Sequence, residues 1–162
     1  MKKYKKILIV THQYLPHVSP RTTRWKLLVD ELIDNGHNVS ILTGMYPDFD
    51  TSNVEIIYFG NKNNINIVSN LREKSKQVAS GDAIKKTFYG VLKKIYRFFI
   101  NYLAWPDYSM FWLYQIYKNR NKISKDYDVI ISVSLPFSSH IAAYVINKKV
   151  KKHWIMDIGD PF

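Results

Sequence analysis

The sequence has no cysteine and little glycine. Its 162 residues include no Cys and only 6 Gly. Without cysteine there can be no disulfide framework and no thiolate metal site, which suits a reducing, cytoplasmic compartment. The chain also lacks any run of roughly 20 apolar residues, the length that a membrane-spanning helix requires. A disulfide-stapled module and an integral membrane protein are therefore not expected.

Aromatic residues and positive charge, by contrast, are abundant. The hydrophobic fraction is 46% and the aromatic fraction is 15%, which predicts one packed domain rather than a disordered chain. The net charge of +11 favours an anionic partner, which could be nucleic acid, a phosphorylated small molecule or an acidic lipid surface. Charge alone does not choose among these partners, and a solvated basic surface is the alternative.

The start of the chain predicts a strand, a helix and a second strand. The first strand covers about residues 6–11, and Ser19 and Pro20 are typical of the N-cap and first turn of a helix. Gly36 is placed to end that helix in a left-handed conformation. Such a βαβ unit implies parallel strands with a right-handed crossover. The apolar stripe expected to pack on the sheet is Trp25, Leu28, Val29, Leu32 and Ile33.

Three further strands are predicted, and the whole pattern is α/β. "VEIIYF" is the third strand, "YDVIISVS" is a strand buried on both faces, and "HWIMDI" is a short buried last strand. Helices are expected over residues 83–105 and 109–121, and after 134 with Ser138 or Ser139 as cap. We predict a Rossmann-like parallel sheet of at least five strands in the order 3-2-1-4-5, with helices on both faces.

The loop after the first strand is the first candidate site. It contains no glycine, whereas a dinucleotide-binding fold would carry G-x-G-x-x-G there. It leads into a helix N-terminus that favours anions, with Arg21 and Arg24 on adjoining turns. These arginines would bind an anionic ligand, or they simply solvate the surface or pair with acidic residues. His12 and His17 lie nearby without a carboxylate, so no metal or other cofactor is predicted.

The loop after the fourth strand is the second candidate site. Open α/β sheets bind ligands at the carboxyl ends of their strands, beside the point where the strand order reverses. By that rule Ser138, Ser139 and His140 share a crevice with the first loop. The alternative is that the hydroxyls only cap the helix and the imidazole only stacks on the surface.

A basic amphipathic helix is the third feature. Apolar residues between 84 and 103 gather on one face of the predicted helix, and cations gather nearly opposite. Such a helix can lie on an anionic membrane, and aromatic residues from Trp105 to Trp112 favour this reading, but packing in a core is the alternative. No nucleic-acid reading module is recognisable, so nucleic acid is not predicted as a partner. The candidate membrane-contact residues are Lys85, Lys86, Lys93, Lys94 and Arg97.

Four segments in order resemble the N-terminal half of bacterial GT-B glycosyltransferases of family 4, which build capsule and other surface polysaccharides. They are "ILIVTHQYLPHVSPRTTRWKLLVDELIDNGHNVSILTG", "WPDYSMFW", "DVIISVSLPFSSHIAA" and "WIMDIGDPF". The family has a similar "SPRxxRW" helix, "PDxxxxW", "DVIxxSxPPxxxHLxA" and "WIxDFRDPW". The resemblance therefore covers nearly the whole chain.

The resemblance implies a domain and an activity. The chain would be the acceptor-side domain, 1–162, of a retaining glycosyltransferase whose nucleotide-sugar-binding domain is a separate part, in cis or in trans. The enzyme would transfer a sugar from a nucleotide-sugar donor to a saccharide or lipid-linked acceptor without a metal, in the cytoplasm, peripheral to the inner face of the membrane. The domain alone would be inactive.

The resemblance also implies roles for particular residues. The family's first-loop motif, which faces the cleft and approaches the donor's phosphates, is matched by Ser19, Pro20, Arg21 and Arg24. His140 matches the crevice histidine, which would lie near the acceptor or the donor sugar. Asp157 and Asp160 match acids of the last motif, in which holding the turn is an equal alternative.

The chain departs from the family pattern at three places, and two other functions compete with the enzyme. Gly159 replaces an arginine, Phe162 replaces a tryptophan, and Val18-Ser19 replaces a glycine pair, which implies an altered site. One competing function is a non-catalytic subunit that recruits a split glycosyltransferase to the membrane. The other is a basic nucleotide- or nucleic-acid-binding protein.

Overall fold

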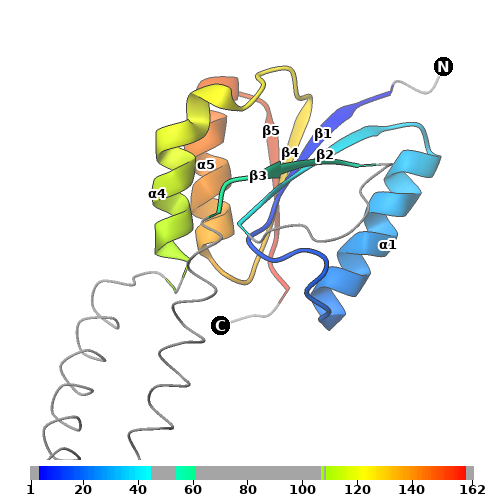
Figure 1. Ribbon diagram of the computed structural model, residues 1–162. Coiled ribbons are helices and arrows are strands. Elements are labelled where there is room, and N and C mark those ends of the chain that lie inside the picture. Colours follow the sequence, from blue (N-terminus) through cyan, green and yellow to red (C-terminus); the bar gives the residue numbers. More distant parts are fainter. Residues whose placement is uncertain (1–3, 45–53, 61–106, 108, 160–162) are drawn as a thin grey trace, which may run out of the picture. The chain divides into compact units, whose positions relative to one another are not determined.

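A computed structural model of the protein describes residues 4–44, 54–60, 107 and 109–159 (Figure 1). The predicted helix over 83–105 lies outside these residues, and so do the candidate membrane-contact residues between Lys85 and Arg97. The described residues on either side of that segment are Gly60, which follows a strand, and Asp107, which precedes a helix.

A five-stranded parallel sheet forms the centre of the fold. Its order is β3-β2-β1-β4-β5, as the sequence predicted. All four strand pairs are parallel; for example, Ile9 of β1 lies opposite Ile41 of β2 and Ile131 of β4. The strands are β1 (Lys6–Val10), β2 (Asn38–Thr43), β3 (Glu55–Tyr58), β4 (Val129–Val133) and β5 (His153–Asp157).

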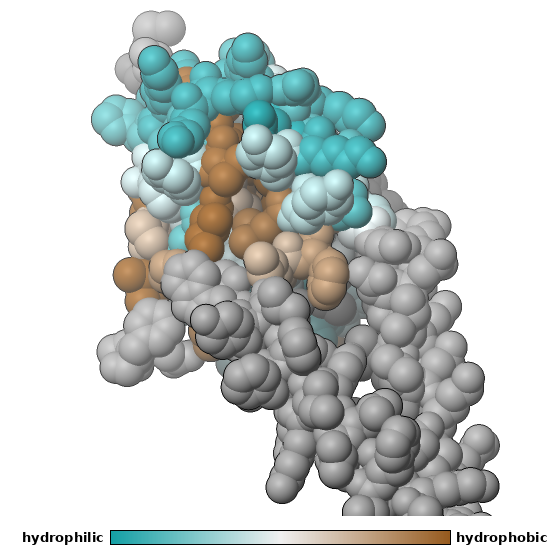
Figure 2. Space-filling view, turned by 90° about the vertical axis from the view of Figure 1, so that its left-hand side faces the viewer, coloured by the Kyte–Doolittle hydropathy of each residue, from teal (hydrophilic) through white to brown (hydrophobic). Residues whose placement is uncertain are grey.

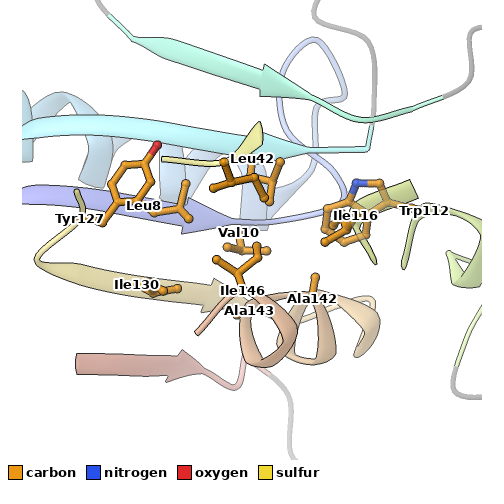
Figure 3. Packing of buried hydrophobic residues seen from close by; sticks show 11 residues of the cluster. Leu8, Val10, Leu42, Trp112, Ile116, Tyr127, Ile130, Ala142, Ala143 and Ile146 are labelled. Carbon is orange, nitrogen blue, oxygen red and sulfur yellow. The ribbon is translucent and has the colours of Figure 1, made fainter. Parts of the chain in front are cut away.

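Helices cover both faces of the sheet, so the predicted Rossmann-like α/β architecture is confirmed. Helix α1 (Pro20–Asp34) packs on one face, and α4 (Met110–Asn119) and α5 (Ser138–Val150) pack on the other (Figure 1). A short 3-10 turn, Arg120–Lys122, extends α4. Figure 3 shows the core on the α4 and α5 side, where Leu8 and Val10 of β1 meet Ile116 of α4 and Ala142 and Ile146 of α5.

Local signals explain helix α1. The hydroxyl of Ser19 accepts a hydrogen bond from the Thr22 backbone, and the Thr22 hydroxyl accepts one from the Ser19 backbone, which completes a capping box. Past the end of the helix, Gly36 has φ +84°, the left-handed conformation that was predicted. Trp25 and Val29 are buried as expected. Leu28 is 43% exposed, so its assignment to the buried stripe was wrong; it lies at the edge of the arc that contacts the sheet.

Two other local predictions were wrong. Neither Ser138 nor Ser139 is the N-cap of α5: the cap residue is Phe137, and both serines lie inside the first turn. Strand β5 is not buried either, because it lies at the edge of the sheet and pairs with β4 alone among the described strands. Its residues Ile155 and Met156 are 54% and 41% exposed.

Candidate functional site

The carboxyl ends of the strands meet at the point where the strand order reverses. Strands β1 and β4 are neighbours in the sheet, and the chain leaves them toward helices on opposite faces. A hydrogen bond of 3.0 Å from the Ser134 backbone N–H to the Asp157 carbonyl joins the ends of β4 and β5. The N-termini of α1 and α5 therefore lie at the same edge, which is where open α/β sheets bind ligands.

The two predicted arginines of α1 reach across to this edge. Arg24 Nη2 lies 2.5 Å from Asp157 Oδ2, and Trp25 Nε1 donates to the same oxygen at 2.7 Å. Arg21 Nη1 donates a longer hydrogen bond, 3.4 Å, to the Leu135 carbonyl. Pairing with an acid, the alternative weighed for both residues, thus holds for Arg24. The ion pair remains accessible, since its side chains are 49% and 25% exposed.

Gly159 leaves room beside these arginines. A Cβ atom at this position would lie 3.7 Å from Arg24 Nη2, 3.8 Å from Arg21 Nε and 3.9 Å from Ser134 Oγ. Gly159 also donates its backbone N–H to Ser134 Oγ at 3.0 Å. Two guanidinium groups and a hydroxyl therefore face one small space, which has room for a Cβ atom in ordinary van der Waals contact. Guanidinium groups are side chains that bind oxyanions such as phosphate.

His140, in the first turn of α5, is almost fully buried. Its Nδ1 is 2.7 Å from Ser132 Oγ, which also accepts a hydrogen bond from Trp154 Nε1 at 2.8 Å. The indole N–H can only donate, so Ser132 Oγ accepts from Trp154, and its own hydrogen has two acceptors within reach, His140 Nδ1 and, at 3.5 Å, the Ile155 carbonyl. Burial lowers the pKa of His140, against the opposing influence of Asp157, so the ring is neutral. Stacking on the surface, the alternative weighed for His140, is excluded by its 3% exposure.

The three predicted serines are engaged within the protein. The Ser19 hydroxyl belongs to the capping box of α1. Ser138 donates its hydroxyl and its backbone N–H to Asp107, at 2.6 and 2.7 Å. The Ser139 hydroxyl accepts the His12 backbone N–H at 3.2 Å. Each serine thus holds a loop or helix end of the site in position.

Asp107 was not predicted as a site residue, and it joins two helix N-termini. Besides the two hydrogen bonds from Ser138, it accepts the backbone N–H and the hydroxyl of Ser109, the N-cap residue of α4, at 2.9 and 2.6 Å. Burial tends to raise the pKa of Asp107, but the hydrogen bonds from Ser109 and Ser138 outweigh it, so the pKa is lowered. The signal in the sequence was the Asp-x-Ser spacing before a helix, which favours an N-terminal cap.

His12 is part of the packed edge of the site. It lies edge-on to Trp112, with ring centroids 5.1 Å apart. Burial lowers the pKa of His12 to about 4, partly opposed by Asp107. Within the described part of the chain, no three His, Cys, Asp or Glu residues are arranged to hold a metal ion.

No model of a protein family matches this chain, and no curated protein matches its sequence. Among the described residues, no helix is both long and apolar enough to cross a membrane.

Proposed function

We propose that this chain is the acceptor-side domain of a retaining glycosyltransferase that acts in surface polysaccharide synthesis. The observation that carries the proposal is the meeting of Arg21, Arg24 and Ser134 around the space at Gly159. That space lies at the carboxyl ends of β4 and β5, next to the switch point between β1 and β4, and open α/β sheets bind ligands at this edge. The four family-like segments of the sequence supply the reaction class.

In this proposal the arginines bind the diphosphate that links the donor sugar to its nucleotide. The reaction forms a bond between an acceptor oxygen and the anomeric carbon, and it breaks the bond from that carbon to the diphosphate oxygen. The acceptor hydroxyl gives its proton to the departing diphosphate. Two guanidinium groups stabilise the negative charge that develops on this leaving group, so no metal ion is required.

Each of the other site residues has a role in the same proposal. Asp157 orients the Arg24 guanidinium, because it accepts from both Arg24 and Trp25. His140 is neutral, and its Nε2 would form a hydrogen bond with a sugar hydroxyl. We assign Ser19, Ser138 and Ser139 to positioning, since their hydroxyls are already hydrogen-bonded within the protein.

The proposed location is the cytoplasmic face of the membrane, where a lipid-linked acceptor would be presented. The basic segment from Lys85 to Arg97 is the proposed anchor, and a second domain, in cis or in trans, would complete the donor site. The cations of that segment would attract acidic lipids at about 1 kcal/mol each.

A non-catalytic recruiting subunit is the second candidate. The observation that favours it is the Arg24–Asp157 ion pair, which uses the charge of one site arginine within the protein. Such a subunit would bind the membrane and a catalytic chain without binding the diphosphate itself.

Diphosphate binding distinguishes the two candidates. We would titrate the chain with UDP, GDP and inorganic diphosphate by calorimetry, and repeat the titration with Arg21→Gln and Arg24→Gln. The enzyme proposal expects millimolar or tighter binding that weakens about tenfold in each variant, the loss of one charge-assisted hydrogen bond. Lys26→Gln is the matched control, because Lys26 lies on the same helix and pairs with Asp30 outside the site.

Two results would contradict the enzyme proposal. One is equal binding of the anion by all variants, which would show that the arginines do not contact it. The other is robust turnover of UDP- or GDP-sugars with lipid-linked acceptors by this chain alone, since the second domain would then be unnecessary.

A further inference from the structure

The positive charge of the described residues is not concentrated at the candidate site. Residues 117–125 and 144–153 contain no Asp or Glu. Both segments lie at the C-terminal ends of helices, α4 with its 3-10 turn and α5, at the edge of the sheet opposite to the candidate site (Figure 1). The eight cations are Lys118, Arg120, Lys122, Lys125, Lys148, Lys149, Lys151 and Lys152.

Contacts between the two helix ends gather these cations into one patch. Lys149 Nζ contacts Asn121 Oδ1, which joins the end of α5 to the end of α4. Arg120 lies over the ring of Tyr117, 3.8 Å from its centroid. Arg120, with a contribution from Lys149, lowers the pKa of the Tyr117 phenol. Cations at a helix C-terminus also interact favourably with the helix dipole. That interaction is limited to residues of the last turn, so it does not account for all eight cations.

An exposed aromatic stripe runs from this patch along the outward side of α4. Met110, Phe111, Tyr114 and Tyr117 are 44%, 77%, 63% and 58% exposed. Trp112 and Ile116, on the opposite side of the same helix, are buried in the core. Figure 2 views the molecule from the side on which α4 and α5 lie, with hydrophilic side chains gathered at one end and hydrophobic ones beside them. The side of α4 that faces away from the core is thus apolar or aromatic.

We propose that this α4/α5 surface, the aromatic stripe of α4 with the eight cations at its end, docks on a layer of anionic lipid headgroups. Lysine and arginine are attracted to acidic lipids, and amphipathic aromatic rings are most stable at the boundary between headgroups and acyl chains. Met110 and Phe111 carry no hydrogen-bonding group in their side chains, so they favour an apolar phase. The stripe also lies on the outward side of a helix, whereas single-stranded nucleic acid is bound in grooves.

This surface would fix the orientation of the protein on the membrane as well as its affinity. The inference rests on the proposed membrane location, but it assigns contact to described residues rather than to the segment from Lys85 to Arg97. Contact through this surface would place α4 along the bilayer surface.

Vesicle sedimentation tests the proposal with the full chain and without donor or acceptor. The probes are vesicles of phosphatidylcholine, with and without phosphatidylglycerol. We expect the chain to bind the vesicles that contain phosphatidylglycerol. Replacing Lys118, Lys122, Lys148 and Lys149 together with Gln should weaken this binding at least about tenfold. The same four residues replaced by Arg keep the charge and should retain binding.

The stripe has its own matched pair of variants. Phe111→Ser with Tyr114→Ser should weaken binding, because the inserted rings are lost. Leu27→Ser with Leu28→Ser removes exposed apolar side chains from α1 instead and should leave binding unchanged. All of these side chains are exposed or half-exposed, and circular dichroism would confirm that each variant folds.

The proposal is overturned if the wild-type chain ignores phosphatidylglycerol, or if the glutamine and serine variants bind as well as wild type. Replacing Lys85, Lys86, Lys93 and Lys94 with Gln tests separately whether the segment from Lys85 to Arg97 binds the vesicles. Binding that is lost only in this last variant would overturn the α4/α5 surface and leave the proposed function standing. If the chain fails to bind diphosphate but binds vesicles normally, the proposed function is overturned and the α4/α5 surface stands.

Discussion

At the scale of residues, the site depends on polar groups whose partners are far away in the sequence. Arg24 and Asp157 are 133 positions apart, and Ser138 and Asp107 are 31 apart. The arginines and His140 could be selected from the sequence because they follow strands at the switch point. Asp107 could not be assigned a role in this way, since its second partner depends on how α4 and α5 pack together.

The burial of His12 predicts a pH-dependent stability. Its pKa in the folded protein is about 4, below the ordinary value of 6.5, so the unfolded chain binds the extra proton first. The contribution is fully present above about pH 6.5 and is lost as the pH falls toward 4, up to about 3 kcal/mol. Urea unfolding at pH 7 and pH 4.5 should show this loss, and His12→Gln should reduce the difference between the two pH values.

The control is His153→Gln, because His153 is exposed at the start of β5. It should leave the pH dependence unchanged. An equally steep dependence in His12→Gln would show that other groups cause the loss; His140, whose pKa is also lowered by burial, would be the next candidate.

At the scale of elements, the sequence predicted most helices and strands because their signals are local. Ser19 and Pro20 start α1, and Gly36 follows its end, as expected from cap chemistry. The start of α5 was predicted wrongly because the prediction used only local signals. Ser138 and Ser139 have the chemistry of caps, but Asp107, from outside the segment, binds the α5 N-terminus instead. A cap supplied by a distant residue leaves no local pattern.

Asp107 is expected to stabilise α4 and α5 together. Asp107→Ala would leave the N–H groups of Ser109 and Ser138 without this carboxylate, which should cost about 1–3 kcal/mol. Urea unfolding measures the loss. Asp126→Asn is the control, because Asp126 makes an ion pair with Lys6 that is exposed to solvent, and such pairs contribute little to stability. Equal stability of both variants would mean that Asp107 is not a shared cap.

At the scale of the whole molecule, the order of the strands determines which of them are buried. Strand β1 pairs on both sides, and Leu8, Ile9 and Val10 are fully buried. Strands β3 and β5 lie at the two edges. The exposed apolar residues of β5 were unexpected, because the composition of a strand does not reveal whether it lies at the centre or at an edge.

Hydrogen exchange should follow this order. Backbone amides of β1 are expected to exchange most slowly, close to the rate set by global unfolding, and those of β5 fastest among the strands. Mass spectrometry of peptides covering residues 6–10 and 153–157 measures the difference. Similar protection of β1 and β5 would mean that a further element covers the outer edge of β5 in solution.

The sequence by itself determined the strands and helices of the described residues, the parallel sheet and the excess of positive charge, because periodicity, caps and composition act over a few residues. Only the tertiary structure decided that Arg24 pairs with Asp157, that Asp107 binds two helices, and that eight cations share one surface away from the candidate site. The physical reason is that such contacts depend on how whole helices pack against the sheet. That packing is set by the summed shape and burial of many side chains rather than by any short segment.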